Sequence, residues 1–413
     1  MDTQLVDWLR DTPDGKVVET VLRACVHCGF CNATCPTYQL LGDELDGPRG
    51  RIYLMKQMFE TGEASTSTLE HLDRCLTCRS CETTCPSGVQ YHKLLDIGRK
   101  TVEMLVARPV GQRLQRRLLR AVVPHPTVFK TLARAGKLVR PLLPESLSAK
   151  LPPRAAPARE RPPLRHARRV LMLEGCAQPE LSPNTNAAAA RVLDRLGISV
   201  VPTTGGGCCG AIDFHLNAQD AARDRARRTI DAWWPAIEAG AETIVQTASG
   251  CGAFIKDYGE LLQDDSRYAA KAARVGELAK DLVEVLRAEP LDVLKLRGGG
   301  RLAVHCPCTL QHAQKLGGAV EEVLRRLGFE LTAVSDGHLC CGSAGTYALT
   351  QPEIATALRD RKLDALESGQ PETIVTANVG CQTHLNGAGR TPVRHWIELV
   401  DAALAQEPSA SIR

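Results

Sequence analysis

The sequence predicts a multidomain α+β protein in which a mainly helical N-terminal domain precedes two copies of an α/β module. A chain of 413 residues is long enough for two to four domains. Two cysteine runs dominate the first quarter of the chain, and a strand–helix pattern that repeats at a fixed offset fills the second half. We therefore expect four segments, with boundaries at residues 1–105, 106–168, 169–290 and 291–413.

The N-terminal domain is organised around the spacing C-x2-C-x2-C-x3-C-P, which spans Cys25–Pro36 and returns at Cys75–Pro86. In bacterial ferredoxins this run binds [4Fe–4S] clusters, with three cysteines on one cluster and the fourth on the other. Zinc sites show paired C-x2-C knuckles instead, and disulfides belong to oxidising compartments, so two [4Fe–4S] clusters are the better interpretation. The predicted ligands are Cys25, Cys28, Cys31 and Cys85 for cluster 1, and Cys75, Cys78, Cys81 and Cys35 for cluster 2.

Helices are expected on both sides of the first run, from Val17 to Ala24 and over the amphipathic stretch from Ile52 to Phe59. The second helix would pack between the clusters and set their separation. Two arginines, Arg49 and Arg51, precede it. They are either a solvated helix start or guanidinium groups that stabilise a reduced cluster and raise its potential.

Composition excludes several classes of protein. A net charge of +4 carries no global nucleic-acid signature, so no nucleic-acid partner is expected. Seventeen cysteines would suggest disulfides in a secreted protein, but the first residues have neither a basic region nor an apolar region of a signal peptide. No stretch approaches the ~18 uncharged apolar residues of a membrane span. We expect a cytoplasmic protein, either soluble or peripheral on the inner face of the cytoplasmic membrane.

The segment from Arg108 to Arg169 is strongly basic, with sixteen Arg or Lys and two acidic residues. Helices are predicted from Gln112 to Val123 and from Val128 to Val139. Prolines follow and predict an extended linker: Pro152, Pro153, Pro157, Pro162 and Pro163. The segment is either a solvated connector or a docking surface for an acidic partner or anionic lipid headgroups.

From Arg169 onward the chain repeats itself with an offset of 132 residues, which relates Cys176 to Cys308 and Cys208 to Cys340. In each copy an apolar strand ends near a cysteine, and helices such as Thr185–Leu196 or Ala319–Leu327 follow. Alternating strands and helices predict a parallel sheet, with the cysteines after the strand ends where such sheets place their sites. Two copies of one unit are expected to face each other around a pseudo-twofold axis, with their cysteine loops close together.

Four cysteines converge in each repeat. The first set is Cys176, Cys208, Cys209 and Cys251, and the second is Cys308, Cys340, Cys341 and Cys381. Adjacent cysteines suit a cluster with several irons better than two positions on one iron. Buried free thiols are the alternative, although four at repeated loop positions are hard to explain that way. We interpret His27, His305 and His312 as structural.

Three segments carry a resemblance to a known family: Cys25–Tyr38, Leu45–Ile52 and His71–Val89. Together with the two repeats, they resemble the iron–sulfur electron-transfer subunits of glycolate, lactate and anaerobic glycerol-3-phosphate dehydrogenases. The most similar members are the iron–sulfur subunits of bacterial glycolate oxidase, also called glycolate dehydrogenase. The repeats resemble the cysteine-rich (CCG) domain shared with heterodisulfide reductases.

In that family the cysteine-rich unit ends in C-x2-C, whereas the last position here is Phe254 in one repeat and His384 in the other. His384 is a candidate replacement ligand, and Cys306 is an extra cysteine close to Cys308. A further iron–sulfur cluster or redox site is therefore expected in the second repeat before the first. Its candidate ligands are Cys308, Cys340, Cys341, Cys381, Cys306 and His384.

The resemblance implies an oxidoreductase complex that converts glycolate to glyoxylate on FAD-containing partner subunits. This chain carries no nucleotide-binding fingerprint, since Gly205–Gly207 runs into Cys208 and opens no phosphate-binding helix. Its role is expected to be electron transfer from FAD to a quinone-type acceptor, without catalytic residues of its own. The alternatives are the equivalent subunit of a lactate or glycerol-3-phosphate system, or a non-enzymatic redox-sensing scaffold.

Overall fold

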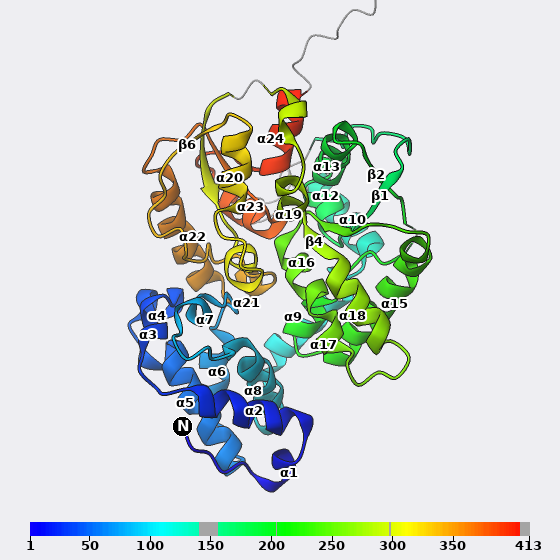
Figure 1. Ribbon diagram of the computed structural model, residues 1–413. Helices are drawn as coiled ribbons and strands as arrows, with labels where there is room; N and C mark the ends of the chain where they lie inside the picture. Colours follow the sequence, from blue (N-terminus) through cyan, green and yellow to red (C-terminus); the bar gives the residue numbers. More distant parts are fainter. Residues whose placement is uncertain (140–155, 204, 297–298, 405–413) are drawn as a thin grey trace, which may run out of the picture.

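The computed structural model describes residues 1–139, 156–203, 205–296 and 299–404. Figure 1 shows a helical N-terminal domain in blue, a first α/β module in green and a second α/β module in yellow to red. The predicted fold class is confirmed: helices alone form the N-terminal domain, and two four-stranded parallel sheets form the modules. No helix of the described ranges is long and apolar enough to cross a membrane.

Short helices wrap the two cysteine runs of the N-terminal domain. Its elements are α1 (Asp7–Arg10), α2 (Pro13–Ala24), α3 (Phe30–Ala33), α4 (Pro36–Leu41), η1 (Glu44–Asp46), α5 (Pro48–Thr61), α6 (Thr66–Asp73), α7 (Ser80–Thr84) and α8 (Tyr91–Leu105). The predicted helices before and after the first run are confirmed within α2 and α5. Thr12 starts α2 by accepting a hydrogen bond from the Gly15 amide, with Pro13 at the first helical position. Leu22, Met55 and Leu94 are fully buried in the core between α2, α5 and α8.

The first half of the basic segment forms two helices, α9 (Val110–Val122) and α10 (Pro126–Val139), as predicted. The helical part of the basic segment is attached to the neighbouring domains. Arg108 and Arg116 pair with Asp73 and Glu103 of the N-terminal domain, and Arg120 reaches Asp213 of the first module. The predicted prolines at 152 and 153 lie outside the described residues, and those at 157, 162 and 163 lie in chain without helix or strand.

Each module is a four-stranded parallel sheet with its first strand in a central position. The first module, of order β2-β1-β3-β4, contains β1 (Arg168–Met172), α12 (Gln178–Leu181), α13 (Asn184–Arg195), β2 (Ile198–Val200), α14 (Ala211–His215), α15 (Gln219–Glu238), β3 (Ile244–Gln246), α16 (Ser249–Lys256), α17 (Tyr258–Leu261), α18 (Ala269–Leu278), β4 (Ala279–Asp281), α19 (Leu282–Arg287) and η3 (Leu291–Leu294). The second, of order β6-β5-β7-β8, contains β5 (Arg301–His305), η4 (Thr309–Ala313), α20 (Ala319–Arg326), β6 (Glu330–Leu331), α21 (Tyr347–Thr350), α22 (Pro352–Glu367), β7 (Thr373–Thr376), α23 (Val379–Asn386), β8 (Val393–His395) and α24 (Trp396–Leu404).

The modules contact each other through reciprocal pairs of equivalent elements. Helix α13 packs on α24, and its counterpart α20 packs on α19; likewise α16 contacts η4, and α23 contacts α12. Exchange of equivalent contacts is what a twofold relation produces, as the repeat predicted. One hydrophobic core, which includes Val170, Met172, Val304 and Trp396, joins the two sheets. The cysteine loops are close, since Asn378 near Cys381 donates a hydrogen bond to Ser249 near Cys251.

The N-terminal domain lies against both modules. Tyr347 Oη donates to the Arg74 carbonyl at 2.9 Å, and Thr83 Oγ1 and His312 Nδ1 lie 2.9 Å apart, so the second module is anchored beside the second cysteine run. On the first module, Asn217 donates to the Arg99 carbonyl at 3.0 Å. These contacts place the N-terminal domain beside both cysteine-bearing modules.

Candidate metal centres

Two cavities in the N-terminal domain are lined by the two cysteine runs in exchanged combination. The first cavity contains Cys25, Cys28 and Cys31 of the first run with Cys85 of the second. The second cavity contains the remaining cysteines, Cys35, Cys75, Cys78 and Cys81. Cys81 also borders the first cavity, so the two lie next to each other.

The donor chemistry of these cavities fits iron–sulfur clusters. Each offers four thiols, the soft ligands of such clusters, and burial raises the pKa of Cys31 to about 11. Without metal the Cys31 thiol therefore holds its proton, which metal binding must displace.

The backbone coils in the same way in both runs. His27 and Gly29 of the first run, and Thr77 and Arg79 at the equivalent positions of the second, all have positive φ. Such left-handed residues cost of order 1–3 kcal/mol when they are not glycine. Gly29 adopts this conformation, with φ of 88°, without that cost. Both runs thus share the same left-handed geometry at equivalent positions.

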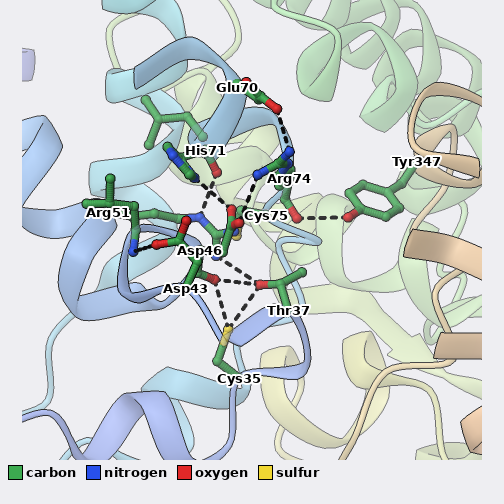
Figure 2. Close-up of polar contacts among 12 residues, drawn as sticks. Cys35, Thr37, Asp43, Asp46, Arg51, Glu70, His71, Arg74, Cys75 and Tyr347 are labelled. Carbon is green, nitrogen blue, oxygen red and sulfur yellow. Dashed lines mark hydrogen bonds and ion pairs between the residues drawn. The ribbon is translucent and has the colours of Figure 1, made fainter. Parts of the chain in front are cut away.

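A buried cation lies beside the second cavity (Figure 2). The Arg51 side chain is 1% exposed and reaches the Asp46 carboxylate at 3.3 Å, while His71 and Arg74 contact the same carboxylate at 2.9 and 3.0 Å. Burial alone would lower the pKa of Arg51, but its neighbours, first among them Cys75, raise it above the ordinary value. Of the two alternatives for Arg51, the structure shows a guanidinium at a cysteine cavity and no solvated helix start.

The first cavity is the more exposed of the two. Cys28 is exposed, and the apolar side chains of Val26, Phe30 and Tyr53 beside it are 68%, 62% and 48% exposed. Arg49 lies here and pairs with Glu44 at 2.6 Å. The second cavity is covered by the second module instead, where Cys78 packs against Cys308, Cys340 and Tyr347.

In the first module the predicted cysteines come together as a chain of thiol contacts, which we call the first quartet. Cys176 contacts Cys208, Cys208 contacts its neighbour Cys209, and Cys209 contacts Cys251. The Cys176 and Cys209 thiols lower the pKa of Cys208 because both donate to it. Apolar residues such as Phe254 and Tyr258 surround this quartet.

The second module repeats the arrangement in the second quartet, in which Cys308 contacts Cys340, Cys340 contacts Cys341, and Cys341 contacts Cys381. Here Cys308 also contacts Cys78, which lines the second cavity. The contacts with Cys340 and Cys78, together with burial, raise the pKa of Cys308 well above its usual value. The second quartet is thus in direct contact with the N-terminal domain.

The structure does not bring the two predicted spare ligands into the second quartet. Cys306 lies in the hydrophobic core between the modules, and His384 Nε2 is bonded to the Ala355 carbonyl at 3.1 Å. The residue that does reach the quartet is His305, whose ring lies with the Cys341 and Cys381 thiols within 4.8 Å of one another. The interpretation of His305 as structural does not account for this contact. The repeat contained a sign of it, because the equivalent residue 132 positions earlier is the apolar Leu173 and His305 departs from that pattern.

A further group of possible ligands, Asp43, Asp46 and His71, is a poorer metal site. The Asp46 carboxylate already accepts from Arg51, His71 and Arg74, so its lone pairs are engaged. This group supports Arg51 and competes with no cysteine set.

Comparison with known proteins finds matching domain families in the same three parts of the chain. Residues 21–89 match the family model of a 4Fe-4S dicluster domain, and residues 170–256 and 302–386 each match that of a cysteine-rich domain. A crystal structure of a hypothetical protein from Helicobacter pylori shares the fold, with a TM-score of 0.56 and 9% identity over 96% of this chain and 73% of that one.

Two curated relatives match along almost the whole length. The glycolate oxidase iron-sulfur subunit of Escherichia coli (strain K12) is 67% identical over 98% of this chain and 100% of its own. A probable glycolate oxidase iron-sulfur subunit of Bacillus subtilis (strain 168) is 30% identical over 89% of this chain and 88% of its own. The predicted resemblance is confirmed: the chain belongs to the family of glycolate oxidase iron–sulfur subunits.

Proposed function

We propose that this chain is the electron-transfer subunit of a glycolate-oxidising complex and carries electrons from FAD on partner subunits to a quinone-type acceptor. The observation that supports this most strongly is the pair of adjacent four-cysteine cavities, with Cys81 on both. A [4Fe–4S] cluster accepts single electrons, which a reduced flavin supplies one at a time. The ligands are Cys25, Cys28, Cys31 and Cys85 for cluster 1, and Cys75, Cys78, Cys81 and Cys35 for cluster 2.

The exposed face of the first cavity is the docking surface for the flavin-bearing partner. Val26, Phe30 and Tyr53 offer apolar contact area around the exposed Cys28. Aromatic residues such as Phe30 and Tyr53 are enriched at protein interfaces. Electrons then pass from the first cavity to the second, and leave toward the second module, where Cys308 contacts Cys78.

We place the complex in the cytoplasm, peripheral on the inner face of the cytoplasmic membrane. The residues that would contact lipid are on α9, where Val110, Leu114 and Leu118 are 70%, 66% and 62% exposed. Arg113 and Arg117 are exposed among them. Apolar side chains flanked by cations are the pattern of a helix that lies in the headgroup region of an anionic bilayer.

The test uses the complex purified with its flavin subunits. Cys78→Ser should abolish glycolate-dependent quinone reduction, while glycolate still reduces the flavin, because Cys78 is needed only after the flavin. Cys306→Ser is the matched control, since Cys306 is a buried cysteine outside both cavities. Full quinone reduction by the Cys78→Ser complex would contradict the proposal.

A further inference from the structure

The second module contains a buried imidazole whose polar atoms are unused. His305 is the last residue of β5 and is 1% exposed. Neither its Nδ1 nor its Nε2 has a hydrogen-bond partner, and the neighbouring Thr376 Oγ1, in register on β7, has none either. A buried polar group without a partner costs of order 1–3 kcal/mol. A protein tolerates an unpaired buried polar group where that group binds a ligand.

We propose that His305 is a nitrogen ligand of an iron–sulfur centre in the second module, held with the thiolates of Cys308, Cys340, Cys341 and Cys381. The His305 ring nitrogen and the Cys341 and Cys381 sulfurs already lie within 4.8 Å of one another. A neutral imidazole nitrogen without a hydrogen-bond partner has a lone pair with which it can bind a metal.

The internal repeat supplies a comparison within one chain. The first quartet has the same four cysteines, but Leu173 takes the place of His305 and belongs to a hydrophobic core. At this position the first module therefore has an apolar side chain packed in its core, whereas the second module has a buried imidazole. This difference predicts that the histidine-ligated centre is confined to the second module.

The charge around the second quartet suits thiolates. Lys362 is 3% exposed, and its ammonium donates to the Asp336 and Gly337 carbonyls at 3.0 and 3.1 Å. The ammonium interacts electrostatically with Cys308, Cys341 and Cys340. A cation at this depth offsets part of the negative charge that metal-bound thiolates would carry.

Five donors also favour an iron–sulfur centre over a single zinc ion. Structural zinc takes four ligands in a tetrahedron, and the second quartet alone supplies four. The quartet is extended, since its contacts run from Cys381 to Cys308 and on to Cys78 of the second cavity. Imidazole in place of thiolate raises the potential of an iron–sulfur centre, which suits an acceptor that receives electrons from an all-cysteine site.

The experiment measures metal content and nitrogen ligation on the full chain, purified anaerobically with its partner subunits. Iron and zinc are counted per chain, and pulsed EPR with ¹⁵N-labelled histidine detects a nitrogen bound to iron. We expect more iron than the about eight of two [4Fe–4S] clusters. His305→Leu should lose the excess iron and the histidine signal, as should the pair Cys340→Ser and Cys341→Ser.

Two further variants separate ligation from folding. His305→Cys should keep the excess iron, lose the histidine signal and shift the potential of the centre downward. His384→Gln should change neither, because the His384 ring is bonded to a backbone carbonyl. The proposal is overturned if the chain holds no metal beyond about eight irons, if the additional metal is zinc, or if His305→Leu leaves the iron count unchanged. The ligation of the centre by His305 does not depend on the proposed function, whereas its role in electron transfer does. Quinone reduction tests the proposed function, and the iron count and histidine signal test the ligation.

Discussion

At the scale of single residues, the second cavity differs from the first by a buried charge. Arg51 Nε donates to the His71 carbonyl at 2.7 Å and Nη1 to Thr37 Oγ1 at 3.2 Å, so the guanidinium is held in one position beside Cys35 and Cys75. Arg49, the counterpart at the first cavity, is 35% exposed in its side chain, so water screens its charge. The more buried cation should make the second cavity the site of higher potential.

Arg51→Gln tests this tuning. The variant removes a buried charge next to Asp46, so we expect the free energy of unfolding to fall by about 3–5 kcal/mol. The potential of cluster 2 should move to more negative values, since no cation compensates the added electron. EPR-monitored redox titration measures the shift. Arg49→Gln is the control and should change stability by about 1 kcal/mol or less, because its pair is exposed; an equal shift of both clusters in either variant would refute the argument.

The pKa values of two equivalent residues at the module interface are shifted in opposite directions. Asp281 and His395 end β4 and β8, and each accepts a hydrogen bond from the amide two residues later, Val283 N at 3.1 Å and Ile397 N at 3.3 Å. Burial raises the pKa of Asp281 to about 7 and lowers that of His395 to about 4. Both side chains are therefore neutral inside the fold between about pH 4 and about pH 7.

The stability of the chain should consequently depend on pH through Asp281. The folded pKa lies above the unfolded one, so this stabilisation is complete below about pH 4 and is lost as the pH rises to about 7. Asp281→Asn keeps the cap and removes the titration, so its denaturation midpoint should exceed that of the parent more at pH 8 than at pH 5. The exposed Asp264→Asn is the control. Parallel pH profiles for all three proteins would show that Asp281 is ionised throughout.

At the scale of elements, the loop after each cysteine pair depends on one glycine. Gly210 and Gly342 both have positive φ, and a Cβ on them would lie 3.0 Å from the Ala222 carbonyl and 2.5 Å from the Ala355 carbonyl. Each glycine thus lets the cysteine pair approach the long helix that follows. This close approach holds Cys340 and Cys341 next to the other cysteines of their module.

Gly342→Ala should displace the cysteine pair. We expect a loss of stability greater than the roughly 1 kcal/mol of a positive φ alone, because backbone must move. Gly328→Ala measures the cost of the positive φ alone, since Gly328 has positive φ but no atom within 4 Å of its Cβ position. Urea denaturation compares the two variants. Equal losses would mean that the contact with Ala355 relaxes without cost.

Helix α9 serves two purposes on two faces. Arg116 is paired with Asp73 at 2.9 Å and Arg120 with Asp213 at 3.1 Å, so these arginines attach the helix to the rest of the protein. The exposed face carries Leu114 and Leu118. Sequence alone left this segment open between a solvated connector and a docking surface, and it did not separate the arginines of the two faces.

The proposed lipid contact separates these two faces. The quadruple variant Arg113→Gln, Arg117→Gln, Leu114→Ala and Leu118→Ala should release the complex from vesicles with anionic lipid at lower salt, with little change in stability. Arg116→Gln should lower stability and leave vesicle binding unchanged, because it breaks internal pairs but leaves the exposed face intact. Vesicle sedimentation over a salt series measures both. Unchanged sedimentation of the quadruple variant would exclude α9 as the lipid contact.

At the scale of the whole molecule, the two cavities and the second quartet lie in succession because the N-terminal domain docks on the second module. Two hydrogen bonds flank the contact between Cys78 and Cys308: Thr83 to His312, and Tyr347 to the Arg74 carbonyl. Figure 2 shows the Tyr347 contact leading directly to the polar network of Arg51. The docking surface therefore also supports the second cavity.

Loosening this docking should slow transfer without removing metal. Tyr347→Phe combined with Thr83→Val deletes both hydrogen bonds, at about 1 kcal/mol each. We expect quinone reduction to fall several-fold while the iron count and flavin reduction by glycolate stay unchanged. Thr20→Val, at an exposed position of α2 outside both surfaces, is the control for handling. Normal quinone reduction by the double variant would indicate that electrons leave by another route.

The chemistry of the chain was predictable because its motifs are local. Four thiols within twelve residues, and a cysteine pair at a constant offset, specify ligand type and fold class wherever the domains lie. The helices α2, α5, α9 and α10 were likewise predictable, since amphipathic spacing and caps act over a few residues. The roles of single residues within those helices were not.

Tertiary structure alone decided which groups meet. Thr83 and His312 are 229 positions apart, and no spacing in the sequence predicts their contact or that of Cys78 with Cys308. The same holds for His305, which adjoins the second quartet although Cys306 and His384 were the predicted spare ligands. Side chains on one strand alternate between its two faces, so a shift of one residue separates the imidazole at 305 from the thiol at 306. Packing of the sheet determines which of those faces meets the cysteines.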